Sequence, residues 1–103
     1  MVVSINTNVA GRPAGTLADA ELHVEDQDGP LSGLKLVGFA VWQRRGGTDR
    51  RVTFPARRYS ITGEQRSFAL LRPIGESPAE ALAQNRVREL IRQAFADCEA
   101  KAA

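Results

Sequence analysis

The feature that most constrains the fold is a change of hydrophobic period near residue 77. Before it, apolar residues recur at every second position, as they do in half-buried strands. After it, they recur at the three- and four-residue spacing of an amphipathic helix. Ser77, Pro78 and Glu80 supply an N-cap, a proline at the first helical position and a capping-box acid. The sequence therefore predicts a helix over about residues 78–100, preceded by strands.

Four strand-like runs come before the helix, at about residues 19–26, 33–43, 50–59 and 66–73. Turns between these runs are indicated by Asp28-Gly29, by a Gly-Gly pair and by Gly63. Pro55 cannot donate to a ladder, so the third run is predicted to be an edge strand or to carry a bulge there. The pattern is typical of an α+β fold, in which a small antiparallel sheet is covered on one face by the C-terminal helix.

The polar segment 1–16 is predicted as a flexible N-terminal arm, and its "VVSI" stretch also fits an extra edge strand. Residues 17–103 then form a single α+β domain, because 103 residues suffice for one modest core. The chain is 43% apolar and 25% charged, which is typical of a globular protein. We expect no membrane span and no secretory signal, and a single cysteine favours a cytoplasmic location.

The chemistry-bearing residues form no catalytic or metal-binding constellation. His23 is the only histidine and lies on the polar face of an acidic strand. Cys98, the only cysteine, falls on the apolar stripe of the helix, where a thiol is usually a packing residue. Glycine-containing segments such as "GRPAG" and "RRGGT" lack the Gly-Lys-Ser/Thr ending of a phosphate loop. The sequence predicts no enzyme activity, no metal and no cofactor.

Charge is unevenly distributed along the chain. The first 34 residues carry five acidic residues against one arginine, whereas residues 35–74 carry nine basic residues against two acidic ones. Guanidinium groups match phosphate oxygens and stack on bases, so such a segment favours a polyanionic partner, DNA or RNA. The candidate nucleic-acid-binding residues, expected to converge on the open sheet face and its hairpin tip near Trp42, are Arg44, Arg45, Arg50, Arg51, Arg57, Arg58, Tyr59 and Arg66.

Alternative interpretations remain open at this stage. The arginines also fit the solvated rim of an ordinary hairpin, where charge blocks unwanted strand pairing. The second face of the 33–43 strand is partly apolar, so we expect a homodimer interface at Leu36, Trp42 and Leu71. A protein-interaction or assembly module without nucleic-acid binding is the main rival. A third hypothesis, a domain that binds an anionic metabolite, requires a closed pocket lined by these arginines.

Residues 34–95 resemble the SpoVG family of bacterial septation and sporulation regulators. "LKLVGFAVWQ" resembles that family's central strand, "VTFPARR" its strand with an internal proline, and "FALLRPI" the next strand, closing in Pro-Ile before a C-terminal helix. Phe54 and Arg72 stand where the family is expected to have methionine and histidine. The resemblance implies a homodimeric regulator that binds DNA or RNA, with contacts at Arg57 and Arg58 and, by looser correspondence, at Arg88 and Arg92.

Overall fold

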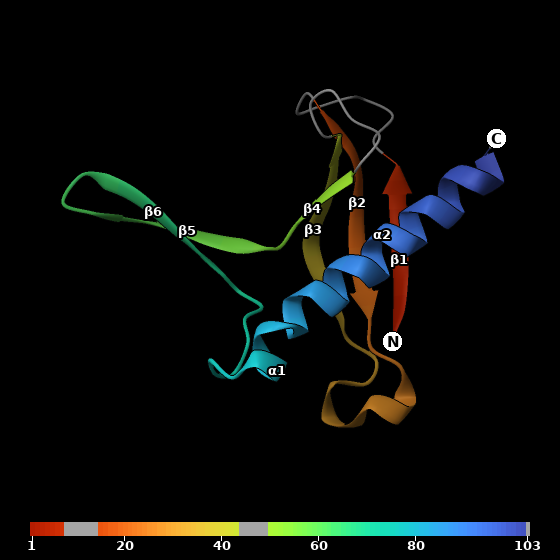
Figure 1. Cartoon of the computed structure of the whole chain (residues 1–103), viewed down its shortest axis with the longest axis horizontal. Helices are drawn as coiled ribbons and strands as arrows, with labels where there is room; N and C mark the ends of the chain where they lie inside the picture. Colours follow the sequence, from red (N-terminus) through yellow and green to blue (C-terminus); the bar gives the residue numbers. More distant parts are fainter. Residues whose placement is uncertain (8–14, 44–49, 103) are drawn as a thin grey trace.

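The structure, a computed structural model, describes residues 1–7, 15–43 and 50–102. An antiparallel sheet and a long helix form its body, and a two-stranded ribbon projects from one side (Figure 1). The elements are, in order, β1 (Val2–Thr7), β2 (Thr16–His23), the 3₁₀ helix η1 (Asp26–Leu31), β3 (Lys35–Gln43), β4 (Arg50–Thr53), β5 (Ala56–Ile61), β6 (Glu64–Ala69), α1 (Pro78–Ala81) and α2 (Ala83–Ala102).

The main sheet has the strand order β1-β2-β3-β4, and every neighbouring pair is antiparallel. Helix α2 lies diagonally across one face, against both edge strands β1 and β4 (Figure 1). The predicted α+β class, with a small antiparallel sheet and one C-terminal helix on it, is confirmed. The opposite sheet face, which we call the open face, is not covered by the helix (Figure 1).

The core lies between this sheet and α2. Alternate residues of β2 face it, and Phe39 and Val41 of β3, Val52 of β4 and two residues of α2 complete it. The fully or nearly fully buried apolar residues are Ala18, Ala20, Leu22, Phe39, Val41, Val52, Ile91 and Phe95. Within β2, the residues that alternate with Ala18, Ala20 and Leu22 from Asp19 onward are polar, as the alternation predicted.

A bulge in β3 changes which of its side chains point toward the core. Its pairing with β2 shifts register between Ala20 and Leu22, which lie opposite Phe39 and Leu36. Gly38 lies within this bulge at φ +102°, and a Cβ built on it would approach the Cβ of Pro55 to 2.9 Å. A glycine is needed there both for the backbone angle and for the close packing of Pro55. The bulge exposes Val37, although a strict two-residue alternation would place it on the same face as the buried Phe39 and Val41.

Pro55 divides the third predicted strand into two strands of different sheets. Residues 50–53 pair with β3, whereas residues 56–61 pair only with β6, so the prediction of one strand over 50–59 is wrong. Pro55 lacks the N–H that a ladder needs, and its buried ring packs on Gly38. The chain therefore turns away from the sheet. The segment predicted at 66–73 follows it as β6, covering only Glu64–Ala69, and does not join the main sheet.

The ends of the chain differ from the prediction in detail. Val2–Thr7, inside the predicted flexible arm, form the edge strand β1 that "VVSI" suggested, and residues 8–14 lie outside the described residues. Strand β2 begins at Thr16 and ends at His23, three residues earlier than the predicted end. The predicted helix is present as α1 and α2, and Ser77 Oγ accepts the N–H of Glu80 at 3.2 Å as its N-cap.

Candidate nucleic-acid interface

The β5–β6 ribbon projects away from the body of the molecule (Figure 1). Nearly all of its residues are exposed, and each strand pairs only with the other. The backbone N–H of Leu70 donates to the carbonyl of Pro55 at 2.9 Å and closes the ladder at its base. Two-stranded ribbons are marginally stable in water by themselves, and this exposed element contributes little to the core.

The register gives the ribbon two unlike faces, since residues directly opposite one another lie on the same side. We call the first the aromatic face. It carries the cross-strand pairs Arg57–Phe68, Tyr59–Arg66 and Ile61–Glu64. We call the second the polar face. It carries the cross-strand pairs Ala56–Ala69, Arg58–Ser67 and Ser60–Gln65.

The ribbon and its base carry an excess of positive charge. The guanidinium of Arg66 pairs with the carboxylate of Glu64 at 3.1 Å, and Arg72 lies over the ring of Phe68 at 5.8 Å from its centroid. No carboxylate of the described residues forms an ion pair with Arg57, Arg58 or Arg72. Two guanidinium groups on the ribbon and a third just beyond its base are therefore available to an anion.

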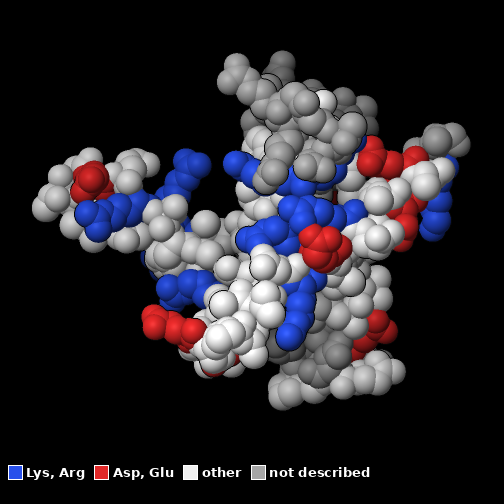
Figure 2. Space-filling model, viewed as in Figure 1, with Lys and Arg blue, Asp and Glu red and all other residues white. Residues whose placement is uncertain are grey.

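A second group of basic residues gathers where α2 passes over β4, with acidic side chains among them (Figure 2). Arg50 reaches Glu99 of α2 at 3.2 Å and lies over the Phe95 ring, while Arg92 Nε donates to the carbonyl of Arg50 at 2.9 Å. Arg88 lies over the ring of Phe54, 5.0 Å from its centroid. These arginines hold the helix against the sheet edge, so much of their hydrogen-bonding capacity is used within the molecule.

Of the predicted arginines that the structure describes, only Arg51 lies on the open face of the sheet. Trp42 and Arg51 are cross-strand neighbours there, and the indole N–H of Trp42 donates to Thr53 Oγ1 at 2.8 Å. Acidic side chains of β2 share this face with them, because they alternate with its buried residues. The face therefore carries both signs of charge.

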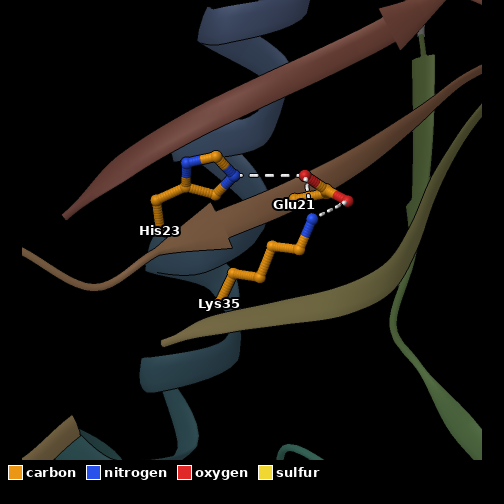
Figure 3. Close-up of polar contacts among 3 residues, drawn as sticks. All are labelled: Glu21, His23 and Lys35. Carbon is orange, nitrogen blue, oxygen red and sulfur yellow. Dashed lines mark hydrogen bonds and ion pairs between the residues drawn. The ribbon is translucent and has the colours of Figure 1, made fainter. Parts of the chain in front are cut away.

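Three residues of the open face form a small polar cluster (Figure 3). His23 Nε2 donates to Glu21 Oε1 at 3.1 Å, and Lys35 Nζ reaches Glu21 Oε2 at 3.3 Å. The hydrogen bond from His23, followed by that from Lys35, lowers the pKa of Glu21 below its ordinary value of 4.5. His23 and Lys35 both bind the carboxylate of Glu21, so their donor groups are already engaged within the cluster. The cluster therefore links β2 to β3 and is not a candidate anion site.

The predicted binding residues therefore lie on separate surfaces. Arg57, Tyr59 and Arg66 share the aromatic face of the ribbon, whereas Arg58 is on its polar face. Arg50 lies under α2 and Arg51 on the open face of the sheet. Arg44 and Arg45 lie outside the described residues. Of the candidates that the structure describes, three lie together on one face and the others are separated from them.

The three predicted dimer residues do not share a face either. Trp42 is on the open face, but Leu36 and Leu71 pack against the core on the helix side, because the β3 bulge turns Leu36 inward. Both line a cavity of about 480 Å³, almost wholly apolar, between the β2–β3 connection and the start of α2. Its other lining residues are Met1, Leu22, Val24, Leu31, Leu34, Lys35 and Val87.

Sequence reasoning missed the polar face of the ribbon. Ser60, Gln65 and Ser67 carry no charge and no ring, so nothing in their residue types drew attention to them. Only the pairing register shows that they flank Arg58 on one side. The signal in the sequence was the alternation along 56–61, which separates Arg57 from Arg58.

Comparison with known proteins identifies no relative: no family model, no curated protein and no solved structure matches this chain. Within the described residues, no cluster of histidine, cysteine, aspartate or glutamate could hold a metal ion. Over the same residues, neither helix provides an apolar stretch long enough to cross a membrane.

Proposed function

We propose that this protein binds nucleic acid through the β5–β6 ribbon, with its arginines on phosphate groups. The observation that carries the proposal is the exposure of Arg57 and Arg58 on a projecting element, and of Arg72 just beyond its base, where no described carboxylate pairs with them. Multiple arginine–phosphate contacts release counterions and dominate affinity for polyanions. Arg88 and Arg92 extend the basic surface toward the body.

The resemblance to the SpoVG family supports the same function. Of its two most specific segments, "VTFPARR" spans the passage from β4 through Pro55 into β5, whereas "FALLRPI" supplies the last two residues of β6 and the five residues after it, so the likeness coincides with the base of the ribbon. We accordingly propose a SpoVG-like regulator, acting by binding and without catalysis, as a cytoplasmic homodimer. Ribbons from two subunits would double the number of phosphate contacts.

An assembly module is the second candidate, and the apolar cavity beside Leu36 and Leu71 favours it. In this case the cavity receives apolar side chains of a protein partner and the arginines only solubilise the ribbon. Association of this kind would persist at high salt and would be indifferent to Arg57→Ala. Nucleic-acid binding would respond in the opposite way to both changes.

The test is a fluorescence anisotropy titration of the full chain with labelled single-stranded and duplex oligonucleotides at two salt concentrations. If four phosphates are neutralised, affinity for a duplex should fall about 100-fold for a fourfold rise in salt. The double variant Arg57→Ala/Arg58→Ala should bind about tenfold more weakly and lower the salt slope by about 2.

The matched control is Arg86→Ala/Lys101→Ala, which removes two equally exposed charges from α2. It should leave affinity within about twofold of the parent, since the lost charges lie on α2 and not on the ribbon. Two results would remove the proposal: no binding to any oligonucleotide at low salt, or equal weakening by the control and the ribbon variant.

A further inference from the structure

The polar face of the ribbon has the composition of a surface that reads base edges. Arg58 and Ser67 lie directly opposite each other, as do Ser60 and Gln65, and Ala56 and Ala69 lie at the base. A guanidinium fork matches O6 and N7 of guanine, a glutamine amide matches N6 and N7 of adenine, and serine hydroxyls suit either. The two alanines add no bulk that would hold the backbone away from a base pair.

These polar groups are uncommitted within the protein. Arg58, Ser60, Gln65 and Ser67 are exposed, and none of them makes a side-chain hydrogen bond or ion pair with any residue that the structure describes. A polar surface built only for solubility has no need of a two-stranded platform projecting from the body. The groups are instead positioned for donors and acceptors that come from outside the molecule.

The aromatic face is less suited to single strands than its composition suggests. The rings of Tyr59 and Phe68 lie 5.7 Å apart at 53°, and the Arg72 guanidinium covers Phe68. The two rings contact one another, and with Tyr59 37% exposed and Phe68 38% exposed each keeps only part of its surface open to a base. Base stacking, which dominates single-strand binding, requires free ring faces. The rings are better placed to stiffen the ribbon than to receive a base.

The dimensions of the ribbon fit duplex DNA. Six residues per strand give a ribbon roughly 20 Å long, with its two strands about 5 Å apart. The major groove of B-DNA is about 12 Å wide and admits a two-stranded ribbon, whereas the major groove of A-form RNA is too narrow for side chains to read. The outer edges of β5 and β6 pair with no described strand, so their N–H groups can donate to the flanking phosphates.

We propose that the ribbon enters the major groove of duplex DNA with its polar face toward the base edges, where Arg58 and Gln65 determine sequence preference. Arg57, on the adjacent face, contacts the phosphate backbone. The inference rests on the proposed nucleic-acid-binding function and deepens it by assigning the substrate class and the specificity residues.

The experiment begins with a pool of duplexes of about 20 base pairs whose central ten or so are randomised, enriched by repeated selection on the full chain. Selectivity is the ratio of Kd for the starting pool to Kd for the enriched duplex, measured by anisotropy. It should reach about tenfold or more for the parent. Arg58→Ala and Gln65→Ala should each reduce it severalfold. Arg57→Ala, matched in charge and adjacent in sequence to Arg58, should weaken both duplexes alike and preserve the ratio.

A second readout reports the groove directly. Protein bound to the enriched duplex should protect guanine N7 from methylation, since N7 lies in the major groove. Tighter binding of either separated strand than of the duplex would overturn the inference, as would undiminished selectivity in Arg58→Ala or protection confined to the minor groove. These results leave the proposed function standing, whereas absence of binding to every oligonucleotide removes both.

Discussion

At the scale of single residues, the structure separates arginines that the sequence places side by side. Arg50 and Arg51 are neighbours in β4, yet one reaches Glu99 under the helix and the other lies beside Trp42 on the open face. Arg57 and Arg58 likewise occupy opposite faces of the ribbon. The cause is the two-residue period of a strand, which directs consecutive side chains to opposite sides. A count of arginines therefore overestimates any one basic surface.

The negative charge of Glu21 contributes to the stability of the folded state. Its pKa is lowered by hydrogen bonds from His23 and Lys35, so the folded state binds its proton less readily than the unfolded state does. The stabilisation is therefore complete above the ordinary value of 4.5 and is lost as pH falls through the lowered pKa. We expect Glu21→Gln to be less stable than the parent near neutral pH, and we expect the difference to vanish in acid.

Urea unfolding of both proteins from about pH 7 to about pH 3 measures this difference. Glu76→Gln is the control, because Glu76 is exposed and forms no ion pair with the rest of the described chain. It should follow the parent at every pH. A gap between Glu21→Gln and the parent that stays constant into acid would show that packing, and not charge, underlies the effect.

At the scale of elements, the meeting of β3 with Pro55 decides the topology. The bulge at Gly38 makes room for the proline ring, and the proline ends β4 and releases the chain into the ribbon. Phe54, just before it, packs edge-on against the core ring of Phe39 at 5.2 Å. Phe54 therefore anchors this part of the chain to the core, and Pro55 ends the pairing of β4 with β3. Strand β5 then begins outside the main sheet.

Gly38→Ala should disrupt this crossing. The variant combines a left-handed backbone angle with a Cβ 2.9 Å from Pro55, and we expect it to lower the free energy of unfolding by about 2 kcal/mol. Gly33→Ala is the matched control, because Gly33 has φ +83° but no atom within 4 Å of the added Cβ. It should lose only about 1 kcal/mol, the strain of the backbone angle alone. Equal losses in denaturant unfolding would contradict a steric role for the Gly38–Pro55 contact.

At the scale of the whole molecule, stability is concentrated in the body. The buried residues of the hydrophobic core belong to β2, β3, β4 and α2, whereas β5 is exposed throughout and β6 almost throughout. The ribbon is held together by its own cross-strand pairs, and it joins the body at its base (Figure 1). A molecule of this shape combines a rigid platform with a slender element of low local stability.

Hydrogen exchange should reveal this division. Amides of residues 56–69 are expected to exchange well before those of β2 and β3, since opening the ribbon exposes little buried apolar surface. Mass spectrometry of the free protein at two concentrations, about tenfold apart, measures the difference. Comparable protection of ribbon and body at both concentrations would contradict the division. Ribbon protection that appears only at the higher concentration would indicate that a second copy covers the ribbon.

The sequence by itself determined the elements whose causes are local. The helix near 78–100 follows from its apolar stripe and from Ser77 and Glu80, and the inward face of β2 follows from alternation. These depend on residues a few positions apart, which a linear pattern records.

Tertiary structure alone decided where the strands pair and which side chains meet. The contact between Gly38 and Pro55 joins positions 17 residues apart, and the β3 bulge that turns Leu36 inward depends on its pairing with β2. The polar face of the ribbon exists only because Arg58 lies opposite Ser67 and Ser60 opposite Gln65. Register across strands is set by packing of the whole chain. The sequence therefore shows which arginines are candidates, but it does not show which of them share a face.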